Sequence, residues 1–127
     1  PVGAVHALAY PLGGHYQLPH GLTNSLVLLP VLKFNLPAAE PLYAELGRAI
    51  LPELNSVSDA LAAADFIEAI AAHVITMPYA QRLREVGVKE HELEMLARDA
   101  MNVQRLLINN PRDVQFADAL SLYQSAY

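Results

Sequence analysis

Residues 1–21, PVGAVHALAYPLGGHYQLPHG, decide how the rest of the chain can be interpreted. Residues 4–10 are apolar and predict a helix. We expect residues 11–14, Pro-Leu-Gly-Gly, to break it, because proline lacks the N–H that a helix needs and glycine accepts positive φ. A second apolar run over residues 22–34 predicts a buried helix. A strand over 26–32 is the alternative, but the length of the run and the lack of alternation favour a helix.

Three histidines, His6, His15 and His20, lie in or beside the expected break. Imidazole is the commonest metal ligand and the usual acid or base near neutral pH. On one straight helix His6 and His20 would lie about 21 Å apart, too far to share a metal. A turn between two helices would bring them together, with Tyr10 on the same face as His6. The alternative is an ordinary helical hairpin whose histidines are core or surface residues.

The composition excludes several classes of protein. The 127 residues are 54% hydrophobic and 17% charged, with a net charge of −5, a pI near 5.4 and a mean hydropathy of +0.23. This balance attracts neither nucleic acid nor anionic membranes, and the apolar excess suggests a surface covered by a partner. No cysteine is present, so disulfides and thiolate metal sites are excluded. We expect no transmembrane span and a cytoplasmic location.

The remaining pattern predicts an all-α domain of six or seven helices. Further helices are expected over 38–51, 59–75, 80–85, 89–106 and 116–125, with Ser58 as the N-cap of the helix at 59–75. The residues expected to face inward are Leu42, Leu46, Ala49 and Ile50; Leu61, Ala64, Ile67 (or Phe66), Ala71 and Val74; Leu93, Leu96, Ala97, Ala100 and Met101; and Ala117, Leu120 and Tyr123 or Tyr127.

Two other patterns carry little weight. Asp65 and Glu68 could form a carboxylate pair, but a solvated helix face explains them better. His91-Glu92 starts an HExxH-like pattern, but Met95 stands where the second histidine is needed.

The opening stretch resembles the signature of the iron-containing (group III) alcohol dehydrogenases. Their spacing, Gly-x-x-His, a later Gly, then His-Gly, is matched by Gly3, His6, Gly13, His20 and Gly21. Further matches are Pro11, Tyr16, Pro19, Asn24, residues 28–30 and 33–35, MPYAQRLREVGV at 77–88 and NNPRDVQFADALSLYQSAY at 109–127. The resemblance therefore extends over nearly the whole chain.

This resemblance implies the C-terminal, dehydroquinate-synthase-like helical domain of a dehydrogenase. It implies that His6 and His20 are two of four protein ligands of a catalytic Fe²⁺ or Zn²⁺, and that NAD or NADP is the cofactor. Tyr10 stands where many members carry a further histidine. A phenol ionises only near about pH 10, so it is a poor base at neutral pH. The implied substrate is a small alcohol or aldehyde, and the enzyme is expected to be a homo-oligomer.

The sequence contains no GxGxxG turn, no convincing strand and no Asp-x-x-x-His. The resemblance places the nucleotide-binding domain and the other two metal ligands upstream. Residues 1–127 are therefore expected to be the C-terminal part of the helical domain, inactive when isolated. The alternative is a non-catalytic helical module that self-associates through apolar faces over 22–32 and 59–75. A small metal-binding bundle unrelated to dehydrogenases is the third hypothesis.

Overall fold

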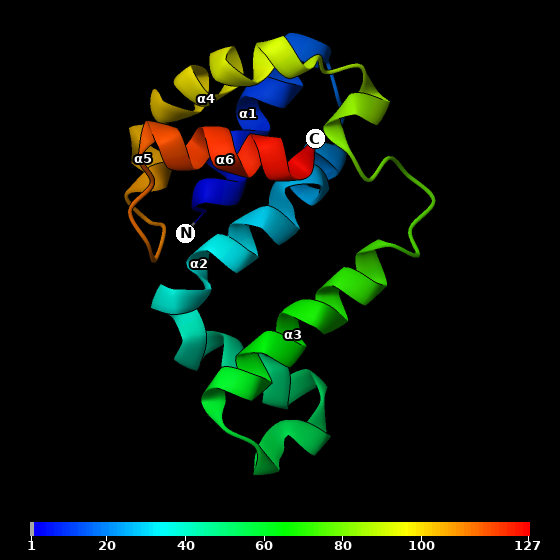
Figure 1. The fold of residues 1–127 in the computed structure, drawn as a ribbon, viewed down its shortest axis with the longest axis vertical. Coiled ribbons are helices and arrows are strands. Elements are labelled where there is room, and N and C mark those ends of the chain that lie inside the picture. The colour runs from blue at the N-terminus through cyan, green and yellow to red at the C-terminus, as the bar shows by residue number, and fades with distance from the viewer. Residues whose placement is uncertain (1) are drawn as a thin grey trace.

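The computed structural model describes residues 2–127, and within them the chain forms helices and connecting segments without a strand (Figure 1). The α-helices are α1 Ala4–Tyr16, α2 His20–Ile50, α3 Asp59–Val74, α4 Leu93–Met101, α5 Gln104–Leu107 and α6 Phe116–Ala126. Three 3₁₀ helices, η1 Pro52–Ser56, η2 Leu83–Val86 and η3 Glu90–Glu92, lie between them. The predicted all-α class with six or seven helices is confirmed.

The helices form two packed groups joined by the long helix α2 (Figure 1). In the larger group, α1 and α6 pack against the N-terminal half of α2, α4 packs against α1 and α6, and α5 packs against α1. Leu8, Val27, Leu96 and Tyr123 are buried in this group. In the smaller group, the C-terminal half of α2 pairs with α3 and η1 around a second hydrophobic cluster. The expected histidine hairpin belongs to the larger group.

The predicted break at residues 11–14 is wrong, because α1 continues through Pro11 and both glycines to Tyr16. Proline removes one helical N–H, but the face around it, including Leu8 and Leu12, is buried. Packing of such a face outweighs the local preference of single residues. The chain turns later, at Gln17, whose φ of 53° ends the helix in the left-handed region.

The predicted end of the second helix at residues 35–37 is also wrong. α2 runs for 31 residues through Pro30, Pro37 and Pro41, so the helices expected at 22–34 and 38–51 are one. Contacts from the segment after α5 hold α2 near Pro37. Arg112 stacks on the Phe34 ring, 4.1 Å from its centroid, and donates a 2.9 Å hydrogen bond to the Phe34 carbonyl oxygen.

The inward face predicted for residues 38–51 is wrong. Leu42, Leu46 and Ile50 are 59%, 50% and 53% exposed, and Ala49 is exposed as well. The residues that face α3 are instead Ala39, Tyr43, Ala44 and Gly47. Apart from Tyr43 these residues are small, and at Gly47 the two backbones approach closely.

The predicted helix at 59–75 is confirmed as α3, and the Ser58 hydroxyl caps it by accepting a hydrogen bond from the Leu61 N–H. Phe66, Ile67 and Val74 are buried as expected, whereas Leu61 is 48% exposed and Ala62 and Ala63 take its place. In the last third of the chain, Leu93, Leu96, Ala97, Ala100 and Tyr123 are buried as predicted and Ala117 is exposed.

Two predicted boundaries in the last third of the chain are wrong. The helix expected at 80–85 is the 3₁₀ turn η2, one turn further on. The helix expected at 89–106 is divided into η3, α4 and α5, with a break at Asn102 and Val103. The helix expected at 116–125 is confirmed as α6.

α2 is long and apolar enough to meet the length and composition criteria of a membrane span, a test that core helices also pass. In the structure 33% of its most apolar window is buried against other helices. The absence of a transmembrane span stays a prediction.

Gly47 allows us to test the close approach of α2 and α3. A Cβ at this position would lie 2.8 Å from the Ala62 carbonyl oxygen, which belongs to rigid helix backbone. We expect Gly47→Ala to lower the free energy of unfolding by about 1–3 kcal/mol, the usual cost of overpacking. The matched control is Gly14→Ala in α1, where a Cβ meets nothing within 4 Å and alanine should be neutral or stabilising. Urea unfolding of both variants measures the difference, and equal stability of the two would contradict the close contact.

Candidate functional site

A helical hairpin made by α1 and α2 brings two of the three histidines together. α1 ends at Tyr16, and Gln17 to Pro19 reverse the chain so that His20 is the first residue of α2. The His6 and His20 ring centroids are 5.3 Å apart, with the ring planes inclined by 53°. The predicted approach of the two imidazoles is confirmed, although the turn lies at residues 17–19 instead of 11–14.

The spacing of the two rings fits a shared divalent cation. A metal bound about 2.1 Å from an imidazole nitrogen lies about 3.2 Å from the ring centroid, so the centroids of two ligands can be at most about 6.4 Å apart. The observed 5.3 Å falls within this limit. Among residues 2–127 no group of three or more His, Cys, Asp or Glu side chains is placed to hold a metal. The hairpin therefore offers two imidazole donors toward a coordination shell.

Tyr10 belongs to the same cluster. Its ring centroid is 6.2 Å from that of His20, and the side chain is 40% exposed, one turn after His6 on α1. His20 is also exposed and His6 is half-buried, so the cluster faces outward. A phenol here can donate a hydrogen bond to a molecule bound over the hairpin.

His20 is held by two neighbours on α2. The Thr23 hydroxyl, which is buried, donates to the His20 carbonyl oxygen at 2.9 Å. The Asn24 side-chain nitrogen lies 3.0 Å from His20 Nε2. Backbone and ring of His20 are thus both fixed from within α2.

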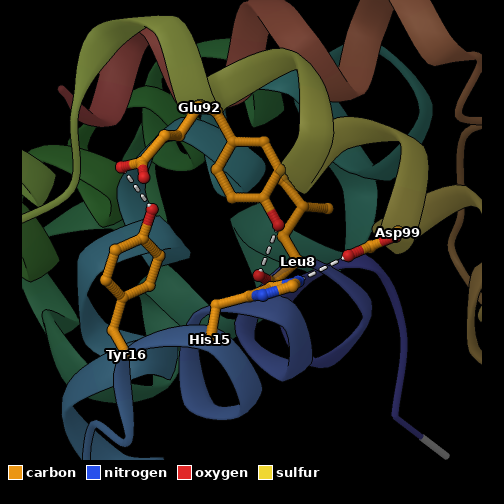
Figure 2. A network of polar contacts seen from close by, with 6 residues as sticks. Leu8, His15, Tyr16, Glu92 and Asp99 are labelled. Carbon is orange, nitrogen blue, oxygen red and sulfur yellow. Dashed lines mark hydrogen bonds and ion pairs between the residues drawn. The ribbon is translucent and has the colours of Figure 1, made fainter.

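The third histidine lies outside the cluster. His15 Nε2 is 2.6 Å from an oxygen of Asp99 on α4, and both side chains are 42% exposed (Figure 2). It links the end of α1 to α4.

The N-terminus of α1, one turn before His6, is fixed by a pair of asparagines. Asn35 and Asn110 exchange two side-chain hydrogen bonds of 3.0 and 2.7 Å. Asn110 Oδ1 also accepts the Ala4 backbone N–H at 3.3 Å, because Gly3 offers no side chain to cap the helix. Asn110 therefore acts as the N-cap of α1, although it lies in a distant part of the chain.

The middle of α1 is fixed by Tyr123 of α6. Tyr123 is completely buried, and its hydroxyl donates a 2.6 Å hydrogen bond to the Leu8 carbonyl oxygen. Figure 2 draws this bond as the dashed line that ends at Leu8. Leu8 lies between His6 and Tyr10 in sequence. Burial raises the pKa of Tyr123, so its hydroxyl stays protonated as a donor.

The C-terminal end of α1 is fixed by Tyr16, whose hydroxyl donates to Glu92 at 2.7 Å (Figure 2). Burial, followed by the contact with the Glu92 carboxylate, raises the pKa of Tyr16 to about 12. The Tyr16 hydroxyl, followed by the Lys89 backbone N–H, lowers the pKa of Glu92. The Tyr16–Glu92 pair thus stabilises the fold above the ordinary pKa of Glu92 and loses this effect as the pH falls through the lowered value.

Tyr16→Phe tests this linkage. The variant removes the main cause of the lowered Glu92 pKa, so the pKa of Glu92 should rise toward its ordinary value, and Tyr16→Phe should lose less stability on acidification than the unmodified chain. Urea unfolding between about pH 7 and about pH 3, with an NMR titration of Glu92, measures the shift. Tyr79→Phe is the control, since the Tyr79 hydroxyl contacts Ser25 and no carboxylate. An unchanged Glu92 titration in Tyr16→Phe would contradict the linkage.

A cleft of about 570 Å³ lies away from the histidines, between α2, α6 and the segment after α3. Lys33, Arg82 and Asp118 are among the residues that line it, and neither His6 nor His20 reaches it. We place the candidate chemistry at the histidine hairpin, because that is where ligating side chains converge.

The family model for the Fe-containing alcohol dehydrogenase family, C-terminal, matches residues 1–127. The chain belongs to the Fe-containing alcohol dehydrogenase family. It is 30% identical over 126 residues to long-chain-alcohol dehydrogenase 1 of Geobacillus thermodenitrificans, covering 99% of this chain and 32% of the relative. It is 29% identical over 126 residues to lactaldehyde reductase of Escherichia coli, covering 99% of this chain and 33% of that protein.

Solved structures of family members share the fold. A 1,3-propanediol oxidoreductase crystal structure matches 98% of this chain and 32% of its own, with a TM-score of 0.91 and 30% identity. An alcohol dehydrogenase from Oenococcus oeni matches with a TM-score of 0.89 and 30% identity, covering 98% of this chain and 32% of its own. The helices described above are thus those of the family's C-terminal domain, and the chain spans about a third of the length of these relatives.

Sequence reasoning from residue types did not find Tyr123, Asn35 or Asn110 as supports of the hairpin. All three act over long sequence separations: Tyr123 bonds a residue 115 positions away, and Asn35 and Asn110 are 75 apart. The resemblance included these positions only as part of longer matching segments. Asn-Asn-Pro at 109–111 predicts a turn, which the structure contains, but nothing local indicates its partners.

Proposed function

We propose that the chain is the C-terminal helical part of a metal-dependent, nicotinamide-dependent alcohol dehydrogenase that interconverts small alcohols and aldehydes. His6 and His20 provide two of the protein ligands of Fe²⁺ or Zn²⁺. The observation that carries the proposal is the 5.3 Å spacing of these two rings at the turn between α1 and α2. Membership of the family, whose relatives include dehydrogenases and a reductase by name, supports the same reaction class.

In this proposal His6, His20 and Tyr10 of the hairpin have separate roles. When bound, the cation supplies Lewis-acid polarisation of the substrate oxygen. His6 and His20 hold it as neutral imidazoles, and the rigid packing of α1 against α4 and α6 keeps His6 in place. Tyr10 lies beside His20, where its hydroxyl donates a hydrogen bond to the bound substrate. A bound nicotinamide would supply the hydride-transfer chemistry, and the residues of the hairpin would orient the substrate oxygen for it.

The nicotinamide domain and the remaining ligands are proposed to come from residues outside 1–127. The support is that the chain spans about a third of its relatives and matches the family's C-terminal model. A small alcohol or aldehyde is the proposed substrate, NAD or NADP the proposed cofactor, and a cytoplasmic homo-oligomer the proposed form of the enzyme. The length of the encoded polypeptide tests this arrangement first.

Activity provides the second test. The 127-residue chain alone should oxidise no alcohol with NAD or NADP, since nothing in residues 2–127 forms the strand-and-helix unit that usually binds a dinucleotide. Positioning the hydride acceptor contributes about 7–11 kcal/mol to such reactions. The longer encoded polypeptide, loaded with Fe²⁺ or Zn²⁺, should reduce the cofactor with a series of primary alcohols and diols. Turnover by the purified 127-residue chain would overturn the proposed division, and a longer protein without dehydrogenase activity would overturn the function.

The alternative, a helical module that self-associates, is favoured by one observation. Leu42, Leu46 and Ile50 form an exposed row at helical spacing on α2, with Leu61 of α3 exposed as well. The row on α2 replaces the face predicted over 22–32, because Leu26, Val27 and Val31 are buried in the core, whereas Leu61 lies within the face predicted over 59–75. Light scattering at micromolar concentration distinguishes the two functions: a module would form a defined oligomer that Leu46→Glu dissociates, without binding any cation at His6 and His20.

A further inference from the structure

The side chain of Asn24 lies where a metal bound at His20 Nε2 would have to approach. Asn24 follows His20 by one turn of α2, and its side-chain nitrogen Nδ2 is 3.0 Å from His20 Nε2. The other amide atom, Oδ1, is shielded from solvent and has no hydrogen-bond partner in the described part of the chain. The amide is thus attached to the site at one end and unpaired at the other.

This contact determines which nitrogen of His20 carries the proton. An amide N–H donates, so Nε2 must offer its lone pair and the ring hydrogen must be on Nδ1. A first-row divalent cation also binds an unprotonated imidazole nitrogen, and the partner of the ring normally selects which one. The Asn24 amide therefore favours the tautomer with an unprotonated Nε2, and in the metal-free protein it is itself hydrogen-bonded to that nitrogen.

The unpaired Oδ1 explains how the amide can leave. A side-chain amide with both ends bonded would be locked, whereas here one hydrogen bond, to His20, holds it. Buried polar atoms without partners are unfavourable, so the present position of the amide is not strongly preferred. Rotation of the amide frees Nε2 while the ring keeps its place near His6.

We propose that Asn24 is a positioning residue of the metal site: it holds the Nε2 lone pair of His20 ready in the metal-free protein, and the incoming divalent cation displaces it. The inference rests on the proposed function, because it assigns the cation to His6 and His20. It gives a role to Asn24, which is not itself a metal ligand but determines the tautomer in which His20 meets the metal.

Histidine ¹⁵N NMR of the metal-free chain, recorded above neutral pH, tests the first half. His20 should show a protonated Nδ1 and an unprotonated Nε2, and Asn24→Leu should shift it toward the opposite tautomer. The control is Ser25→Ala, the next residue, whose hydroxyl contacts Tyr79 and not His20. A protonated Nε2 in the unmodified chain, or no change in Asn24→Leu, would overturn the proposal. This measurement needs no metal and so stands apart from the proposed function.

A Co²⁺ titration of the same proteins tests the second half. Removing one competing hydrogen bond should strengthen Co²⁺ binding by about 2- to 10-fold in Asn24→Leu, with unchanged circular dichroism and thermal unfolding. Weaker binding in Asn24→Leu would show that the amide supports the metal instead of giving way to it, and would refute displacement. If the unmodified chain binds no Co²⁺ at His6 and His20, the proposed function fails, while the NMR result still decides the role of Asn24.

Discussion

Replacing His20 with alanine should weaken divalent cation binding by at least about 100-fold, more than the 10- to 100-fold typical for losing an outer-shell partner. His6→Ala should have the same effect, because the two rings face each other across 5.3 Å and each supplies one of two donors. In the longer enzyme proposed above, both variants should lose metal and dehydrogenase activity together. Tyr10→Phe should be milder, since it removes a hydrogen-bond donor and no ligand.

Paramagnetic broadening by Co²⁺ measures this on the chain itself. The resonances of His6 and His20 should broaden together at the lowest Co²⁺ concentration, and either alanine variant should abolish the broadening of the remaining ring. His73→Ala and His91→Ala are matched controls, as both are exposed histidines outside the hairpin. Equal broadening of all five histidines would exclude a shared site.

The candidate site could be predicted from the sequence because its residues are close together along the chain. His6, Tyr10 and His20 lie within one hairpin, so a turn between two apolar helices was sufficient to bring them together. The exact position of the turn could not be predicted from the sequence. Pro11 and the two glycines have poor helix preference, but Leu8 and Leu12 pack against the core and keep α1 helical past them.

The errors along α2 have the same physical origin. A proline such as Pro37 usually ends a helix. Here α2 continues, because Arg112 and Asn110, more than seventy residues later in the chain, bind α2 beside Pro37. Leu46 looks like a core residue by its type, but the close contact at Gly47 turns small side chains toward α3 and leaves the leucine outside. The local pattern predicts which segments are helical and roughly how long they are. Where a helix ends and which of its residues face the core depend on contacts with residues distant in sequence.

The asparagine pair is the support of α1 whose loss should affect stability most. Asn110→Ala removes both hydrogen bonds to Asn35, which is only 5% exposed, and the bond to the Ala4 N–H. A buried donor and a buried acceptor on Asn35 lose their partners, at roughly 1–3 kcal/mol each before relaxation. We therefore expect the free energy of unfolding to fall by about 2–4 kcal/mol.

The neighbouring residue provides the control for Asn110. Asn109 is exposed, and its side chain donates to the backbone oxygens of Val2 and Arg105 at the surface. Asn109→Ala should therefore lower the free energy of unfolding by less than about 1 kcal/mol. Because α1 carries His6 one turn from the lost cap, Asn110→Ala should also increase amide hydrogen exchange over the first turn of α1, while exchange in α3 changes only as much as global stability requires. Similar unfolding curves for the two variants, or unchanged exchange at the start of α1, would show that the asparagine pair does not hold the helix that carries His6.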